Sequence, residues 1–164
     1  MKRIFIAVGL LLLAGLSACA YEPAAFVYDD NFVAPRSHWQ GLRMYVAADS
    51  ITSTGLRLSM VNESEIIFGH GTVFHIQHYS AGVWRQVPFI NEAFWTWPIL
   101  KVNSNSTVDE NISWEHMHGQ LPPGKYRVVR SFMERNQSGT SWAQAWNRGE
   151  ARLHAIFIVE GDYY

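Results

Sequence analysis

The sequence predicts an all-β domain, built as an antiparallel sandwich of seven to eight strands. Alternating apolar and polar residues recur every ten to fifteen positions with turn signals between them, which is typical of a sandwich and not of alternating strands and helices. Aromatic residues make up 14% of the chain, with seven Trp, while charged residues make up only 16%. Aromatic residues favour strands, and helix-forming composition is confined to residues 141–147, where a single turn is the most we expect.

The clearest strand covers residues 55–62, where Leu56, Leu58 and Met60 alternate with polar residues and predict one buried face. Residues 80–82, Ser-Ala-Gly, predict the turn of a hairpin between residues 72–79 and 83–87. The remaining strands are expected at residues 42–48, 94–102, 106–114, 124–133 and 151–160.

Three residues disturb these patterns. Pro98 interrupts an apolar run, so an edge strand or a kink is expected there. Glu110 lies in phase with the apolar residues of its strand, and Arg130 breaks the alternation of the next one. Either a bulge or an ion pair must accommodate Arg130.

The first nineteen residues, MKRIFIAVGLLLLAGLSAC, have the anatomy of a secretory signal, with Lys2 and Arg3 followed by a short apolar stretch. Residues 16–19, Leu-Ser-Ala-Cys, resemble the lipobox of bacterial lipoproteins, in which the cysteine is acylated and becomes the new N-terminus. We therefore expect residues 1–18 to be removed and Cys19 to carry acyl chains that hold the protein on a membrane. A plain secretory signal with a chance cysteine is the alternative.

Residues 19–40 contain two prolines, an acidic pair and aromatic residues without a steady period, and they predict a tether. Fully extended it reaches roughly 70 Å at ~3.4 Å per residue, although its aromatic residues leave open that part of it packs on the domain. The sandwich is expected over residues 41–161. No later apolar run has the length of a membrane span, so the acyl chains are the expected anchor. Residue 20 is Ala and not Asp, which by the sorting convention of such lipoproteins favours the outer membrane of a cell envelope with two membranes.

Charge and motif content argue against several classes of function. Residues 19–164 carry 11 Lys and Arg against 14 Asp and Glu, so no basic surface for nucleic acid is expected. The pair His75 and His78 falls on opposite faces of a strand, and the pair His116 and His118 has no further ligands at metal spacing, so no metal site and no cofactor are expected. The elbow and zinc motifs of hydrolases are absent from the sequence, and we expect no enzyme.

Residues 134–150 form the candidate binding segment. Trp142 and Trp146 lie there between Arg135 and Arg148, and Trp with Arg on an exposed loop is the composition of interaction hot spots. The alternative is that both tryptophans fold back and cap the open end of the sandwich. Trp95 and Trp97 share a strand face, where a layer of the core is favoured over a sugar-stacking ledge.

Three stretches carry a resemblance to a known family. They are LSMVNES at residues 58–64 with Phe68 and Gly69 shortly after, ISW at residues 112–114, and GQLPPGKYRVV at residues 119–129. Together they resemble bacterial immunoglobulin-like domains of secreted and lipid-anchored proteins, over about residues 42–160. The resemblance implies an immunoglobulin-like sandwich in an extracytoplasmic setting, and it implies neither an enzyme nor a ligand.

Gly124 and Tyr126 resemble the tyrosine corner of immunoglobulin-like sandwiches, in which the phenol bonds to upstream backbone and fixes a Greek-key crossover. The alternative is that Tyr126 is an ordinary strand aromatic. The chain departs from the family pattern at His118, where an aromatic residue is usual, and in the long segment 134–150.

These observations lead to a first hypothesis and two alternatives. The first is a noncatalytic, lipid-anchored lipoprotein of the bacterial cell envelope, whose immunoglobulin-like domain binds a protein or glycan partner. The second is a secreted proteinase inhibitor that acts through the loop 134–150, and the third is a hydrolase of envelope polymers.

Overall fold

The computed structural model describes residues 34–91, 98–135 and 150–161 of the chain. In these residues it contains ten strands, one short 3-10 helix and one single-turn α-helix. In chain order they are β1 (His38–Trp39), β2 (Leu42–Val46), η1 (Ala48–Ser50), β3 (Gly55–Asn62), β4 (Ile67–His70), β5 (His75–Ser80), β6 (Val83–Gln86), β7 (Leu100–Val102), β8 (Ser106–Ser113), α1 (Glu115–His118), β9 (Gly124–Arg135) and β10 (Glu150–Val159).

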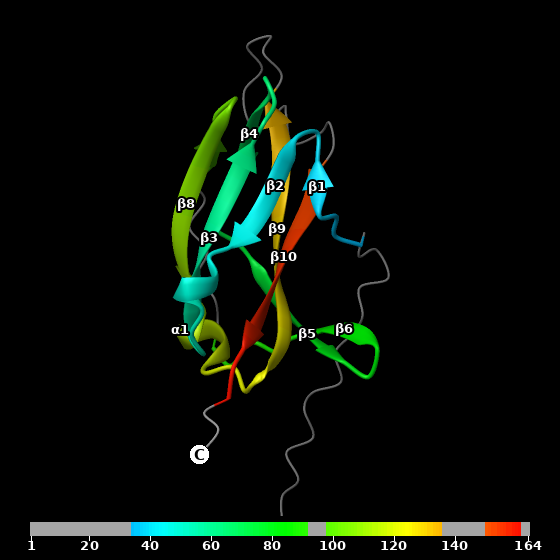
Figure 1. Ribbon diagram of the computed structural model, residues 1–164, viewed down its shortest axis with the longest axis vertical. Coiled ribbons are helices and arrows are strands. Elements are labelled where there is room, and N and C mark those ends of the chain that lie inside the picture. The colour runs from blue at the N-terminus through cyan, green and yellow to red at the C-terminus, as the bar shows by residue number, and fades with distance from the viewer. Residues whose placement is uncertain (1–33, 92–97, 136–149, 162–164) are drawn as a thin grey trace, which may run out of the picture.

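The strands form two sheets that pack face to face (Figure 1). The four-stranded sheet has the order β1-β2-β3-β8, and the six-stranded sheet has the order β6-β5-β9-β4-β7 with β10 also paired to β9. All the strand pairs in both sheets are antiparallel. The predicted all-β antiparallel sandwich is therefore confirmed.

Strand β9 is the central strand of the six-stranded sheet and pairs with three other strands. On one edge its residues 124–133 pair with the whole of β10. On the other edge it pairs with two shorter strands placed end to end, β5 opposite residues 126–129 and β4 opposite residues 132–135. This division of one edge between two strands, together with the short β1 and β7, is why the described residues contain more strands than the seven or eight expected.

The core fills the space between the sheets. Leu56, Leu58 and Met60 of β3 are buried there, as their alternation predicts. In β10 every second residue from Ala151 to Val159 is buried, while Ile156 and Ile158 face outward. One end of the core is aromatic, because Phe157 stacks on both Trp114 and Tyr126 with ring centroids 5.4 Å and 5.7 Å away.

The chain joins the sandwich before residue 41, where the domain was expected to begin. Arg36 forms a parallel bridge with Leu153 of β10, and β1 then pairs with β2 in the other sheet. The Trp39 ring lies 5.3 Å from Phe68. The last residues of the expected tether therefore pack on the domain, which is the alternative that its aromatic residues leave open.

Helix α1 has no counterpart among the elements expected from the sequence. It follows Trp114, whose indole Nε1 donates a hydrogen bond of 2.8 Å to the Ser53 carbonyl. The buried Trp114 thereby fixes the chain at the end of β8, and one helical turn carries it toward β9. The expected turn at residues 141–147 lies outside the described residues.

Candidate functional site

The structure describes part of the sites expected from the sequence. Arg135 is the last residue of β9 and is half-buried. Trp142, Trp146 and Arg148 lie outside the described residues, as does Cys19. Trp95 and Trp97 also lie outside them. The candidate binding segment and the anchor therefore remain predictions.

Gly124 and Tyr126 stand at the start of β9, where a tyrosine corner would lie. The Tyr126 hydroxyl donates a hydrogen bond of 2.8 Å to the Pro122 carbonyl, four residues upstream, and its ring stacks on His78 at 4.8 Å. Burial raises the pKa of Tyr126, which keeps the hydroxyl protonated and able to donate. A side chain on Gly124 would place its Cβ 3.0 Å from His78 Nε2, so the corner is closely packed.

Arg130 and Glu110, the two charged residues that disturb the strand patterns, form an ion pair between the two sheets. Arg130 Nη1 donates to Glu110 Oε2, and Nη2 lies 3.3 Å from Oε1. Arg130 is almost fully buried, and it lies in the stretch of β9 between the residues that pair with β5 and those that pair with β4. The arginine is accommodated by its ion pair with Glu110 and by the break between β4 and β5 on the neighbouring edge. The ion pair is part of the core.

His70 completes this buried cluster. Its Nδ1 lies 2.9 Å from the Gly71 carbonyl and 3.5 Å from Arg130 Nη1. Burial lowers the pKa of His70, and the positive charge of Arg130 lowers it further. The imidazole is therefore held neutral and adds no second positive charge beside the guanidinium.

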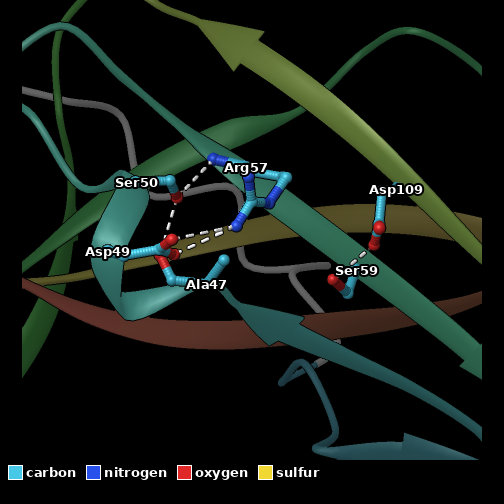
Figure 2. Close-up of polar contacts among 6 residues, drawn as sticks. All are labelled: Ala47, Asp49, Ser50, Arg57, Ser59 and Asp109. Atoms are coloured by element: carbon cyan, nitrogen blue, oxygen red, sulfur yellow. Dashed lines mark hydrogen bonds and ion pairs between the residues drawn. The ribbon is translucent and has the colours of Figure 1, made fainter.

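A second group of polar side chains lies on the outer face of the four-stranded sheet (Figure 2). Arg57 Nη2 lies 3.0 Å from Asp49 Oδ1, and the Ser59 hydroxyl donates a hydrogen bond of 2.5 Å to Asp109. The Ser50 hydroxyl donates to the Ala47 carbonyl and accepts from the Arg57 amide, which ties η1 to β3. Each of these polar groups is satisfied by a neighbour, so the group stabilises the sheet.

A third group lies on the outer face of the six-stranded sheet, and it combines aromatic rings with cations. We call it the β5–β9 patch, and it consists of Gln77, Tyr79, Trp84, Lys125 and Arg127. The Arg127 guanidinium lies 4.5 Å from the Trp84 ring centroid, and Lys125 Nζ lies 5.0 Å from the Tyr79 ring and 6.0 Å from the Trp84 ring. Arg127 Nε also donates a hydrogen bond of 2.6 Å to Gln77 Oε1. Cations at these distances from aromatic faces are attracted by the ring quadrupole.

Strand register creates this patch. Gln77 of β5 is opposite Arg127 of β9, and Tyr79 is opposite Trp84 across the β5–β6 hairpin. Because successive side chains of a strand alternate between faces, residues 125 and 127 of β9 point outward together, as do residues 77 and 79 of β5. The five side chains therefore form two adjacent rows across three strands.

Two exposed isoleucines of β10 extend the patch. Ile156 is paired with Arg127 and is 48% exposed, and Ile158 is paired with Lys125 and is 58% exposed. Large apolar side chains in such a position, next to aromatic rings and cations, are a recurrent composition of interaction surfaces. The outward face of β9 thus lies between an aromatic hairpin and an aliphatic strand.

This patch is not among the sites expected from the sequence, although a signal for it is present there. The hairpin predicted around residues 80–82 makes Tyr79 and Trp84 cross-strand neighbours, and the strand predicted at 124–133 alternates Lys125 and Arg127 with its core residues. The sequence alone does not indicate that β5 and β9 are neighbours in one sheet. That pairing joins residues fifty positions apart.

Comparison with known proteins places these features in a family. The family model described as bacterial Ig-like domain matches residues 38–145. A search of curated proteins found no match to the chain. In the described part of the chain, no helix is long and apolar enough to cross a membrane, and no cluster of three or more His, Cys, Asp or Glu residues could hold a metal ion. The matched region covers most of the sandwich and includes the corner at Tyr126, and the chain belongs to the bacterial Ig-like domain family.

Proposed function

We propose that this protein is a noncatalytic lipoprotein of the bacterial cell envelope, held by acyl chains on Cys19, whose Ig-like domain binds a protein or glycan partner. The β5–β9 patch is the observation that carries the binding part of the proposal. The segment 134–150, with Trp142 and Trp146, is the competing site on the same domain.

The composition of the patch supports a binding role. Trp, Tyr and Arg are the residues most enriched among interface hot spots, and all three are in contact here. The side chains stand on paired strands, which hold them at fixed spacing and reduce the entropy lost on binding. Exposed Ile156 and Ile158 add apolar area that a partner would remove from water.

Two observations support a noncatalytic role. The family to which the chain belongs consists of Ig-like domains, which typically bind or serve as structural units. The acidic groups in the polar clusters of the described residues are paired internally, Glu110 with Arg130 and Asp109 with the Ser59 hydroxyl. Such pairing stabilises the fold and leaves neither carboxylate free to act as an acid or a base.

The anchor is tested by replacing the acylated residue. Cys19→Ala is expected to leave the precursor unprocessed at this position and to remove the protein from the lipid-modified fraction, because the thiol that receives the diacylglyceryl group is gone. Intact-mass measurement of the purified protein reads both effects. Ser17→Ala is the matched control, since a small residue is kept there and acylation is expected to persist. A mature wild-type N-terminus at any other residue, without acyl mass, contradicts the anchor. In a cell with two membranes, fractionation is expected to place the protein in the outer one.

The binding site is tested by retention of envelope material on the full-length, acylated protein. Trp84→Ala removes the ring that contacts Arg127 and Tyr79, and we expect it to reduce retention about tenfold or more, as hot-spot truncations do. Tyr45→Ala is the matched control, because Tyr45 is an exposed aromatic residue on the other sheet. Thermal unfolding of each variant establishes that it is folded.

The double variant Trp142→Ala/Trp146→Ala separates the two candidate sites. Residues 136–149 connect the end of β9 to the start of β10, whereas Lys125 is near the start of β9. Ten strand residues at ~3.4 Å each place Arg135, after which the loop begins, about 34 Å from Lys125. If only the double variant loses retention, the binding function stands and its site is the loop. If wild-type protein retains no partner from its native envelope, the proposed function is contradicted.

A further inference from the structure

We infer that the β5–β9 patch binds an acidic, partly apolar segment of a partner protein. The inference rests on the proposed function and names the partner class of the same site. It follows from the charge of this face of the sheet, from the apolar residues that border the patch, and from the packing of Arg127 and Tyr79 on the Trp84 ring.

The outer face of the six-stranded sheet is cationic, although the chain as a whole is slightly acidic. By strand alternation the outward charged residues of β7, β9 and β10 are Lys101, Lys125, Arg127, Arg135, Arg152 and Glu150. The acidic member of this set, Glu150, lies 3.7 Å from Arg152 at the start of β10, away from the patch. An anionic partner is therefore complementary to the patch.

The two outer faces of the sandwich differ in how their cations are balanced. On the four-stranded side Arg57 contacts Asp49 at 3.0 Å, and Arg43 lies 3.7 Å from Glu63. Lys125 contacts the Tyr79 and Trp84 rings instead, and within the described residues it has no acidic partner. As far as the described residues go, its ammonium group can therefore pair with a carboxylate of a partner without first breaking an ion pair of the domain.

The exposed isoleucines beside the patch indicate that a partner supplies apolar atoms as well as negative charge. Ile156 and Ile158 are next to Arg127 and Lys125 in the register, and both are about half exposed. An occupant that pairs with the cations therefore also covers these side chains, and it gains by supplying apolar atoms of its own. A protein segment in which Asp or Glu residues alternate with apolar residues meets both requirements.

Two other occupants fit less well. A sugar ring stacks on an exposed aromatic face, but the Arg127 guanidinium lies over the Trp84 ring at 4.5 Å and Tyr79 packs against the ring at 5.0 Å. A second copy of the chain docked through the same face would bring like cations together, which is unfavourable in a self-complementary interface. Charge and packing both favour an acidic protein segment.

Site-specific photocrosslinking in isolated native envelopes tests the inference on the full-length, acylated protein. A photoreactive amino acid replaces Ile158, which is exposed and adjacent to Lys125, and the same amino acid at Tyr45 on the other sheet measures background. Lys125→Glu is then combined with the Ile158 probe, and Lys125→Arg is its charge-conserving control. Mass spectrometry identifies what is crosslinked and through which segment.

We expect a protease-sensitive adduct at Ile158 that is joined through a segment richer in Asp and Glu than in Lys and Arg. Lys125→Glu is expected to lower its yield roughly fivefold or more, the factor that corresponds to about 1 kcal/mol, while Lys125→Arg keeps it. Raising the salt from about 0.05 M to about 0.5 M is expected to lower the yield as well, because exposed charges are screened.

The other outcomes overturn the inference in distinguishable ways. An adduct with a glycan or a lipid, an adduct with a second copy of this chain, or a protein adduct indifferent to Lys125→Glu contradicts the acidic segment and leaves a binding function in place. An Ile158 yield no higher than the Tyr45 background contradicts this site for any partner.

Discussion

At the scale of single residues, Tyr126 joins a hydrogen bond and two ring contacts at one point of the fold. Its hydroxyl donates to Pro122 at 2.8 Å, and its ring packs between His78 and Phe157. Tyr126→Phe removes the hydroxyl and keeps the ring, and it leaves the Pro122 carbonyl without this donor. We expect a loss of about 1 kcal/mol in the free energy of unfolding, measured by urea denaturation.

Tyr126→Leu is the companion to that substitution. It removes the ring as well, so its loss is expected to exceed that of Tyr126→Phe because the packing on Phe157 disappears. A denaturation midpoint of Tyr126→Phe equal to that of the wild type would show that the hydroxyl contributes nothing to the corner.

The buried pair Arg130 and Glu110 is the other residue-scale determinant. Arg130 is almost fully buried, so Glu110→Ala leaves its guanidinium without a counter-charge between the sheets. Removing one partner of a buried pair costs about 3–5 kcal/mol, and we expect a loss of that order in the free energy of unfolding.

The double variant Glu110→Leu/Arg130→Met separates the charge effect from packing. It removes both charges and restores apolar volume, and we expect it to recover most of the stability lost in Glu110→Ala. Chemical denaturation of both variants measures the difference. A double variant as unstable as the single one would mean that the ion pair itself, and not the unpaired arginine, decides stability.

At the scale of elements, the close approach of β3 and β8 depends on Gly55. A Cβ at this position would lie 2.6 Å from the Ile112 carbonyl, which is backbone and cannot move aside as a side chain can. Gly55→Ala is therefore expected to lower the free energy of unfolding by about 1–3 kcal/mol.

Gly71→Ala is the matched control for this substitution. Gly71 lies between β4 and β5, and a Cβ there would meet only the Val73 amide, at 3.9 Å. We expect a change of less than about 1 kcal/mol, toward higher stability if it differs at all, because alanine restricts the unfolded chain. Equal melting temperatures for the two variants would contradict the contact between Gly55 and β8.

The elements also show what the sequence can and cannot indicate. The alternation in β3, the hairpin of β5 and β6 and the corner before β9 are local patterns, and all three are present. The partner of Arg130 is not local, because Glu110 lies twenty residues away on the opposite sheet. The break between β4 and β5 lies opposite Arg130 of β9, so its position also depends on a residue far along the chain.

At the scale of the whole molecule, the same distinction separates the two candidate sites. The segment 134–150 is recognisable from the sequence because its tryptophans and arginines are close together in the chain. The β5–β9 patch becomes visible only when residues 77–84 and 125–127 are brought side by side by the sheet. A site whose residues come from several strands depends on which strands pair with one another. Composition and the spacing of residues along the chain do not determine that pairing.

The whole fold is also expected to respond to pH through its buried histidines. Burial is the first cause that lowers the pKa of His70, His75, His118 and His154. In the unfolded chain histidine titrates near its ordinary pKa of about 6.5. Below that value the unfolded chain therefore binds more protons than the folded one, and the free energy of unfolding falls as the pH falls.

Urea denaturation at pH 7.5 and pH 5.5 measures this effect, and we expect stability to be lower at pH 5.5 by about 1 kcal/mol or more. The window lies above the range in which ordinary carboxylates become protonated, so histidine dominates it. His70→Asn keeps a donor for the Gly71 carbonyl and removes one titrating group beside Arg130, and it is expected to reduce the difference between the two pH values. Stability that is equal at both pH values, or higher at pH 5.5, would mean that the folded sandwich accepts protons on these rings as readily as the unfolded chain does.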